Sequence, residues 1–196
     1  VALTPSDRSE TVCFQVRLAI DIRRFPWVSR FSADYAFDFP RLAPFFAGDP
    51  ARSDAWADAI LRAQAHPRDR STVAAVVRAQ QDRRGAPAEA RVAADRLADV
   101  ATVAVVTGQQ AGLFGGPLYT LYKTITGIAF ARELESATGR PVVPIFWIAS
   151  DDHDFEEVRR AHLNDTGAEP RTLEYPLDAV PAGVSVARVV LGAPIE

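Results

Sequence analysis

The sequence has no methionine, one cysteine and one lysine. Cys13 alone excludes an internal disulfide and fits a reducing compartment, so we expect a cytoplasmic protein. No apolar run approaches the roughly 20 residues of a membrane-spanning helix. The apolar stretch at residues 11–22 is short and is broken by Arg17 and Asp21, which makes it a poor signal peptide. These absences argue against a membrane protein and against a secreted one.

The charge balance is also unremarkable, with 22 Lys and Arg against 25 Asp and Glu. A net charge of −3 gives no electrostatic reason to expect nucleic acid as a partner. With 48% hydrophobic residues the chain can bury a core. Because methionine is absent and the chain starts at Val1, we expect either a lost start or a piece of a longer protein. Lys123 is the single lysine in a chain rich in arginine, and both chance and a chemical role remain open for it.

The most informative stretch predicts a strand, a glycine-rich loop, a helix and a second strand. Residues 100–106 are small or β-branched and apolar, which is typical of a strand buried on both faces of a parallel sheet. A loop with four glycines follows at residues 107–116. Apolar residues then recur with a helical period from Leu118 to the stop at Gly139, and residues 145–149 resume as a strand. The order predicts one βαβ unit with a right-handed crossover.

The carboxyl ends of these two strands are expected to carry the functional site. In an open parallel sheet, ligands bind beyond those ends, so the loops at residues 107–116 and 150–154 should share one edge. The first loop offers backbone N–H groups and a helix N-terminus, which suit an anion. The second offers four ionisable residues in a row, namely Asp151, Asp152, His153 and Asp154.

The segment before the central stretch is predicted to be mostly helical. Residues 1–19 show no pattern and stay an unassigned extension, and residues 20–22 fit a short strand. Three helices should cover one face of the sheet, at residues 54–65, 71–84 and 88–98. Residues 20–99 are therefore interpreted as a helical N-terminal part that packs on the core.

The segment after the acidic cluster is predicted to be short and mixed. We expect one or two helical turns over residues 155–163, and strands at residues 171–177 and 184–191. These elements leave a thin sheet, and no element closes the chain at Glu196. We therefore expect residues 100–196 to form a Rossmann-like α/β core, a parallel sheet with flanking helices, that is truncated on its C-terminal side.

The glycine loop matches neither common phosphate-binding fingerprint. Its glycines are not spaced as G-x-G-x-x-G, and a P-loop needs lysine at the helix start, whereas Lys123 lies about 9 Å further along the helix axis. A helical wheel puts Lys123 opposite an apolar stripe made of Leu118, Leu121, Tyr122 and Ile125. The Lys123 side also carries Tyr119 and Phe130, so we expect something outside the chain to cover it. Gln109 and Gln110 suit a carboxylate or hydroxyl ligand, or are simply polar loop residues.

The acidic cluster has three interpretations. His153 between carboxylates can act as an acid–base catalyst, or donate to a phosphate or a developing oxyanion. Carboxylates and an imidazole can instead hold a divalent metal. In the third interpretation, Asp152 or Asp154 only caps a short helix that begins at Phe155. The position at the sheet edge favours a functional role.

Two long motifs carry a resemblance to a known family. VVTGQQAGLFGGPLYTLYK and VPIFWIASDDHDFEEV, with RRFPW and ADYAFDF before them, resemble the BshC family, the cysteine-adding enzymes of bacillithiol biosynthesis. The resemblance runs from about Ile20 to the end. It implies a Rossmann-type core in a ligase that joins cysteine to glucosaminyl-malate, the last step of the pathway. It also implies ATP as the energy source, leaves Mg²⁺ open, and implies a homodimer formed through a C-terminal coiled coil that this chain lacks.

The family's signature positions fall on two groups of residues here. The first group is Thr107, Gly108, Gln109, Gln110, Gly112, Gly116, Tyr119 and Lys123, and the second is Trp147, Asp152, His153, Asp154 and Phe155. The resemblance implies that Asp152, His153 and Asp154 are catalytic, and that the first group and Trp147 bind substrate or nucleotide. It assigns no metal ligand. Ser150 and Asp151 depart from the threonine and glutamate expected there, which keeps one carboxylate.

The sequence thus leaves three hypotheses of function. The first is the N-terminal part of an ATP-dependent carbon–nitrogen ligase, which would be inactive as this piece alone. The second is a metal-dependent hydrolase built on the cluster from Asp151 to Asp154, and the third is a non-catalytic ligand-binding module. The expected partners are the small molecules cysteine and glucosaminyl-malate, with neither nucleic acid nor a membrane.

Overall fold

A computed structural model of the protein describes residues 20–176 and 183–192. Contacts divide the chain into two compact units, Val1–Ala51 and Arg52–Glu196. The helices at residues 53–96 therefore share a unit with the central strands, while the division of the sequence at residues 19 and 99 stays a prediction. No helix in the described ranges is long and apolar enough to cross a membrane.

The first unit has an aromatic cluster. Its described part contains α1 (Arg30–Phe37) and the 3-10 helices η1 (Ile22–Arg24), η2 (Phe39–Arg41) and η3 (Ala43–Phe45). The ring centres of Tyr35, Phe39 and Phe46 lie between 5.3 and 5.8 Å apart. The strand expected at residues 20–22 is wrong, because the carboxylate of Asp21 accepts a backbone N–H two residues on at 3.0 Å and starts η1 instead.

Three helices open the second unit close to their predicted positions. They are α2 (Ser53–Ala65), α3 (Arg70–Arg83) and α4 (Ala88–Arg96). α3 begins one residue earlier than expected, because the carboxylate of Asp69 accepts the N–H of Thr72 at 3.1 Å and caps the helix. α4 ends two residues before its predicted end.

The central stretch forms the predicted βαβ unit of a Rossmann-like α/β fold. It consists of β1 (Val103–Gln110), α5 (Leu118–Thr138) and β2 (Val142–Ala149), and the two strands are parallel and in register over their whole length. β1 starts three residues later than expected, because the carboxylate of Asp99 accepts the N–H of Ala101 at 2.8 Å in a turn. Gly139, at φ 65°, ends α5 in the left-handed conformation that glycine favours.

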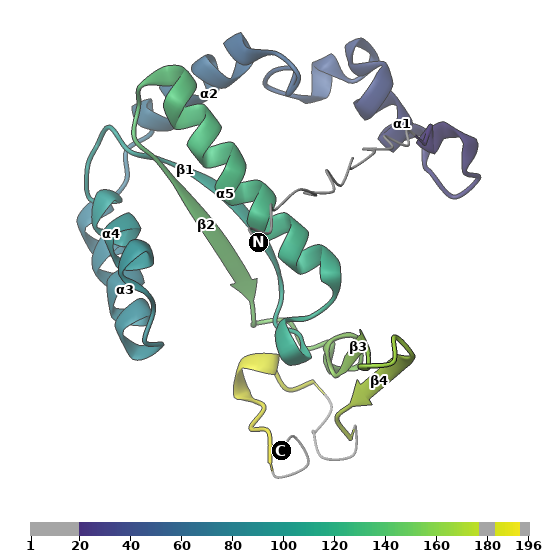
Figure 1. Ribbon diagram of the computed structural model, residues 1–196. Helices are drawn as coiled ribbons and strands as arrows, with labels where there is room; N and C mark the ends of the chain where they lie inside the picture. The colour runs from purple at the N-terminus through teal and green to yellow at the C-terminus, as the bar shows by residue number, and fades with distance from the viewer. Residues whose placement is uncertain (1–19, 177–182, 193–196) are drawn as a thin grey trace, which may run out of the picture. The chain divides into compact units, whose positions relative to one another are not determined.

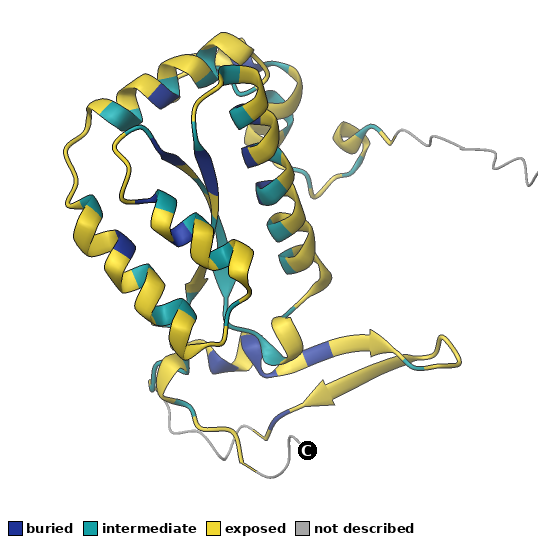
Figure 2. Cartoon of the chain, turned by 60° about the vertical axis from the view of Figure 1, so that its left-hand side comes forward, coloured by how far each residue is buried: buried dark blue, intermediate teal, exposed yellow. Residues whose placement is uncertain are grey.

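Helices cover both faces of this strand pair (Figures 1 and 2). On one face, Ile60 of α2 and Ala131 of α5 join Val142 in one buried cluster. On the other face, Ala74 of α3 clusters with Val143. Because successive strand residues point to opposite sides of a sheet, these neighbouring valines need helices on both sides. The prediction that α2, α3 and α4 all cover one face is therefore wrong.

The face of α5 that meets the strands is formed by Gly127, Ala131 and Leu134. Gly127 is buried there, and a Cβ added to it would lie 3.1 Å from Cγ2 of Thr107. The outer face of α5 is exposed in Figure 2, and it carries the apolar stripe of the helical wheel, namely Leu118, Leu121, Tyr122 and Ile125. The side opposite this stripe, which was expected to be covered from outside the chain, packs on the strands instead.

The chain after β2 forms a second, smaller sheet. Its elements are α6 (Phe155–Val158), β3 (Arg160–Asn164), β4 (Pro170–Glu174) and η6 (Val186–Arg188), and β3 pairs antiparallel with β4. The helical turns expected over residues 155–163 are one turn followed by a strand. The strand expected from residue 171 is confirmed as β4, although residue 177 lies outside the described ranges. The strand expected at residues 184–191 is wrong, because η6 occupies its middle.

Glu135 ties α5 to its neighbours. Its carboxylate accepts the N–H of Val142 at 3.0 Å and the guanidinium of Arg96 at 2.8 Å. The bond from Val142 first, and then the bond from Arg96, lowers the pKa of Glu135. We expect Glu135→Gln to reduce the free energy of unfolding at neutral pH by about 1 kcal/mol. Because the folded-state pKa is lowered, this stabilisation is present above the ordinary carboxyl pKa and is lost as the pH falls through the folded-state value.

Urea unfolding of wild type and Glu135→Gln, at neutral pH and in acid below the folded-state pKa of Glu135, checks this expectation. The matched control is Glu133→Gln, an exposed position on the same helix. A stability difference that stayed constant between the two pH values would contradict it.

Candidate functional site

The glycine loop and the acidic loop meet at one edge of the sheet. Gln110, the last residue of β1, lies opposite Ala149, the last residue of β2. The side chain of Gln110 also donates to Oε2 of Glu157, which follows the acidic loop, at 3.4 Å. The predicted shared edge is therefore confirmed, with the correction that residues 107–110 belong to β1 and that the loop itself starts at Ala111.

The glycine loop makes a tight turn before α5. It contains η4 (Leu113–Gly115), and Phe114, Gly115 and Gly116 have φ of 52°, 91° and 79°, a region that glycine adopts freely. A Cβ on Gly112 would lie 2.6 Å from Cα of Gly116, so the two glycines allow the turn to close. The first N–H groups of α5 lack partners within the helix. Oγ1 of Thr120 is buried and has no hydrogen-bond partner among the described residues, so the turn can donate to an anion.

Lys123 lies beside this turn, where α5 passes the end of β1. Its Nζ donates to the carbonyl of Gly108 at 3.3 Å and to Oε1 of Gln109 at 2.8 Å. It also lies 5.4 Å from the centre of the Tyr119 ring. Nε2 of Gln109 donates in turn to the Tyr119 hydroxyl at 3.1 Å. The side of α5 that was expected to be covered from outside the chain thus faces the end of β1, and its cation is aimed at the candidate site.

The acidic loop is fixed by the segment around η6. The N–H of Val186 donates to the carbonyl of Asp152, and the N–H of Ala187 donates to the carbonyl of Ser150, both at 2.8 Å. The hydroxyl of Ser185 donates to the same Ser150 carbonyl at 2.7 Å. Residues 183–192 therefore hold the backbone of the loop in one conformation.

Asp152 is the acidic residue that is best integrated into the site. Its Oδ1 accepts the N–H of Asp154 at 3.1 Å. That bond first, then the backbone N–H of His153, the side chain of Gln110 and the charge of His153, lowers the pKa of Asp152. Its carboxyl group is therefore held in the ionised form, ready to pair with a cationic group of a ligand.

Asp154 and His153 have different surroundings. Oδ1 of Asp154 accepts the N–H of Glu157 at 3.1 Å and caps α6, as in the helix-cap interpretation, so a catalytic role for Asp154 stays a prediction. The His153 side chain is 77% exposed, with Nδ1 3.9 Å from Oδ1 of Asp152. Within the described ranges, no group of three or more His, Cys, Asp or Glu residues could hold a metal ion. The hydrolase hypothesis thus finds no donor set there.

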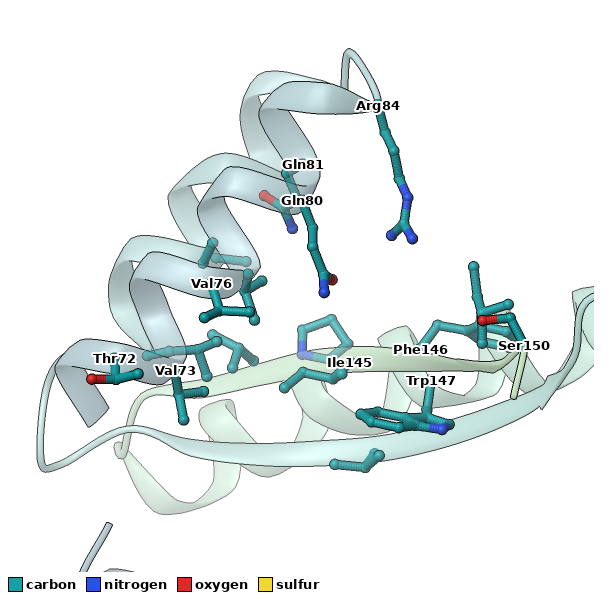
Figure 3. A pocket seen from close by; sticks show the side chains of 18 of the residues that line it. Thr72, Val73, Val76, Gln80, Gln81, Arg84, Ile145, Phe146, Trp147 and Ser150 are labelled. Atoms are coloured by element: carbon teal, nitrogen blue, oxygen red, sulfur yellow. The ribbon is translucent and has the colours of Figure 1, made fainter. Parts of the chain in front are cut away.

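Other predicted site residues lie apart from the glycine turn. Thr107 packs against Gly127 of α5. Trp147 is 64% exposed and lines a groove of about 890 Å³ between β2 and α3. Figure 3 shows its ring on the strands, with Arg84 reaching from the end of α3 toward them. Binding roles for Thr107 and Trp147 stay predictions, and the structure does not bring these two residues to the turn.

The pocket at the glycine turn includes residues that the sequence did not single out. It has a volume of about 460 Å³ and lies between the turn and the chain after the acidic loop. It is lined on one side by Gln109, Gln110, Gly112, Gly116 and Tyr119, and on the other by Glu156, Glu157, Arg160 and His162. In the sequence, the signal for these residues was the pair of glutamates that follows the acidic cluster. A helix was expected over residues 155–163, but α6 ends at Val158, and the chain then continues as β3, which lines the pocket.

Comparison with known proteins identifies related sequences. The family model described as "Bacillithiol biosynthesis BshC, N-terminal Rossmann-like domain" matches residues 18–193. A protein of Salinibacter ruber named "Putative cysteine ligase BshC" is 43% identical over 152 residues, which cover 77% of this chain and 28% of that protein. A protein of the same name from Solibacter usitatus is 37% identical over 169 residues, covering 86% and 30%. The chain therefore spans less than a third of the length of these relatives.

Proposed function

This chain belongs to the BshC family, and on that premise we propose that the whole protein is an ATP-dependent ligase that adds cysteine to glucosaminyl-malate. The product of that step would be bacillithiol. The name of the two relatives, "Putative cysteine ligase BshC", supports this proposal. The observation that carries it is the parallel register of β1 and β2, which sets Gln110 opposite Ala149. That register brings the two family motifs to one edge at the strand ends, where ligands of parallel α/β sheets bind.

The proposed reaction joins a carboxylate to an amine. A bond forms between the carboxyl carbon of cysteine and the amine nitrogen of the glucosamine. One carboxylate oxygen leaves, and the attacking amine gives up a proton. ATP, when bound, would supply the phosphoryl or adenylyl group that carries this oxygen away. The residues of this chain have to hold the reactants in line and manage the proton.

The glycine turn fits a phosphate group. Gly115 and Gly116 have positive φ, and α5 presents its N-terminus beside them. The hydroxyl of Thr120 is buried there and unpartnered among the described residues, while Lys123 adds a cation next to the turn. We propose that these groups hold the phosphates of ATP or a substrate carboxylate. Mg²⁺ keeps several waters and needs only one or two carboxylates beside phosphates, a role for which the acidic loop offers Asp152.

The acidic loop would handle the amine. Asp152 has a lowered pKa, which suits a carboxylate that orients an ammonium group more than one that removes a proton. Imidazole is the better proton acceptor near neutral pH, so we assign proton removal to His153. Its exposure leaves room for a substrate beside Asp152.

The whole protein's assembly belongs to the same proposal. We propose a cytoplasmic homodimer formed through a C-terminal coiled coil. Because the chain spans less than a third of its relatives' length, we expect the 196-residue chain alone to be inactive in the ligase reaction.

The test is to incubate the full-length protein with ATP, cysteine and glucosaminyl-malate and to measure bacillithiol by mass spectrometry. We expect product only when all three are present, and a fall of about 100-fold or more in Asp152→Ala and His153→Ala. Lack of product in both purified and cell-extract formats would reject the ligase. If both variants restored bacillithiol in deficient cells as well as wild type does, a non-catalytic binding module would be favoured.

A further inference from the structure

A continuous chain of hydrogen bonds crosses the candidate site from α5 to α6. Nζ of Lys123 donates to Oε1 of Gln109 at 2.8 Å. Nε2 of Gln109 donates to Oε1 of Gln110, and Nε2 of Gln110 donates to Oε2 of Glu157 at 3.4 Å. A cation on one element is thereby linked to a carboxylate on another through two adjacent strand-end amides.

The charges at the two ends fix the direction of this chain. An ammonium group can only donate, so Gln109 must turn its oxygen toward Lys123 and its nitrogen toward Gln110. An ionised carboxylate can only accept, so Gln110 must turn its nitrogen toward Glu157. Each end therefore selects the same orientation of both amides. Turning either amide over would put two acceptors or two donors against each other.

The two amides also engage each other and Tyr119. The carbonyl of Gln110 remains on Gln109, whose nitrogen also reaches the Tyr119 hydroxyl at 3.1 Å. The orientation of the two glutamines thus depends on Glu157 as well as on Lys123.

We propose that Glu157 is a positioning residue of the ligase, acting through Gln110 and Gln109 on the groups that those amides present to the substrates. This inference rests on the proposed function. Glu157 lines the pocket at the glycine turn, but its effect is exerted through the amides. Without its carboxylate, the orientation of Gln110 is set only from the Lys123 end.

The activity test uses the full-length protein and Glu157→Gln, whose amide can accept from Gln110 or donate to it. We expect kcat/KM to fall by about tenfold with Tm unchanged. The matched control is Glu133→Gln on the exposed face of α5, which should keep wild-type activity. The double variant with Lys123→Met should lose no more than Lys123→Met alone, because both residues act on one set of amides. Additive losses, or wild-type activity in Glu157→Gln, would overturn the proposal.

A second measurement separates this inference from the ligase activity. The protein is labelled with ¹⁵N at glutamine side chains, and the amide signals are compared in wild type, Glu157→Ala and Glu133→Gln. Glu157→Ala adds no glutamine signal, and it should shift those of Gln109 and Gln110, whereas Glu133→Gln should leave them in place. Unmoved signals in Glu157→Ala would refute the positioning role. Absence of bacillithiol in wild type with shifted signals would reject the ligase and leave the hydrogen-bond chain standing.

Discussion

Lys123→Met in the full-length protein should reduce bacillithiol formation by about 100-fold or more. The side chain contributes the cation beside the glycine turn, with Nζ bonded to Gly108 and Gln109. Methionine has a similar length but no charge, so a developing negative charge on an activated carboxylate or a phosphate would lose its stabilising partner. The variant also loses one of the two ends that orient Gln109 and Gln110.

Rates measured by mass spectrometry at saturating substrate check this expectation. The control is Arg132→Met, which removes an exposed cation from the same helix about 13 Å further along its axis. Lys123→Arg should recover only part of the loss, because a planar guanidinium does not reproduce the geometry of an ammonium group. A Lys123→Met protein as active as the Arg132→Met control would show that the cation is structural.

Gly108→Ala should be the most destabilising single-methyl change at the site. A Cβ at this position would lie 2.4 Å from the carbonyl oxygen of Trp147 and 3.0 Å from its Cβ. Both atoms belong to the neighbouring strand, and a backbone oxygen paired in a sheet cannot move aside alone. The strands would have to separate where both loops start, at a cost of about 3 kcal/mol in the free energy of unfolding.

Chemical unfolding followed by circular dichroism measures this cost. The control is Gly139→Ala, where nothing lies within 4 Å of an added Cβ and only the positive φ of 65° is strained, at about 1 kcal/mol. Ligase activity in Gly108→Ala should fall as well, because Gly108 also supplies the carbonyl that holds Lys123. If Gly108→Ala were no less stable than Gly139→Ala, the tight strand pairing at this position would be contradicted.

The βαβ unit was predictable because its signals are local. Gly139 and Pro141 stop α5, and a run of β-branched and apolar residues on each side of the helix marks a strand. Two parallel strands joined by one helix must end at the same edge, so the meeting of the glycine loop and the acidic loop followed as well. The helices before β1 were placed within two residues for the same reason.

The parts that failed depend on what packs against what. The side of α5 opposite Leu118 and Ile125 was expected to be covered from outside the chain, yet it packs on the strands, because the backbone of α5 comes close to Thr107 at Gly127. The helix expected after Phe155 gives way to β3, whose pairing with β4 lies outside any local pattern. Glu157 could not be recognised as a partner of Gln110, since 47 residues separate them.

The sequence by itself determined the order of elements, the βαβ unit, the two motifs of the BshC family and the edge where those motifs meet. These follow from periodicity, from stop signals and from the connectivity of parallel strands. Only the tertiary structure decided which face of α5 packs on the strands, where Lys123 points, and which carboxylate completes the chain through Gln109 and Gln110. Those outcomes depend on side-chain volume and on hydrogen bonds between distant residues, which no local pattern encodes.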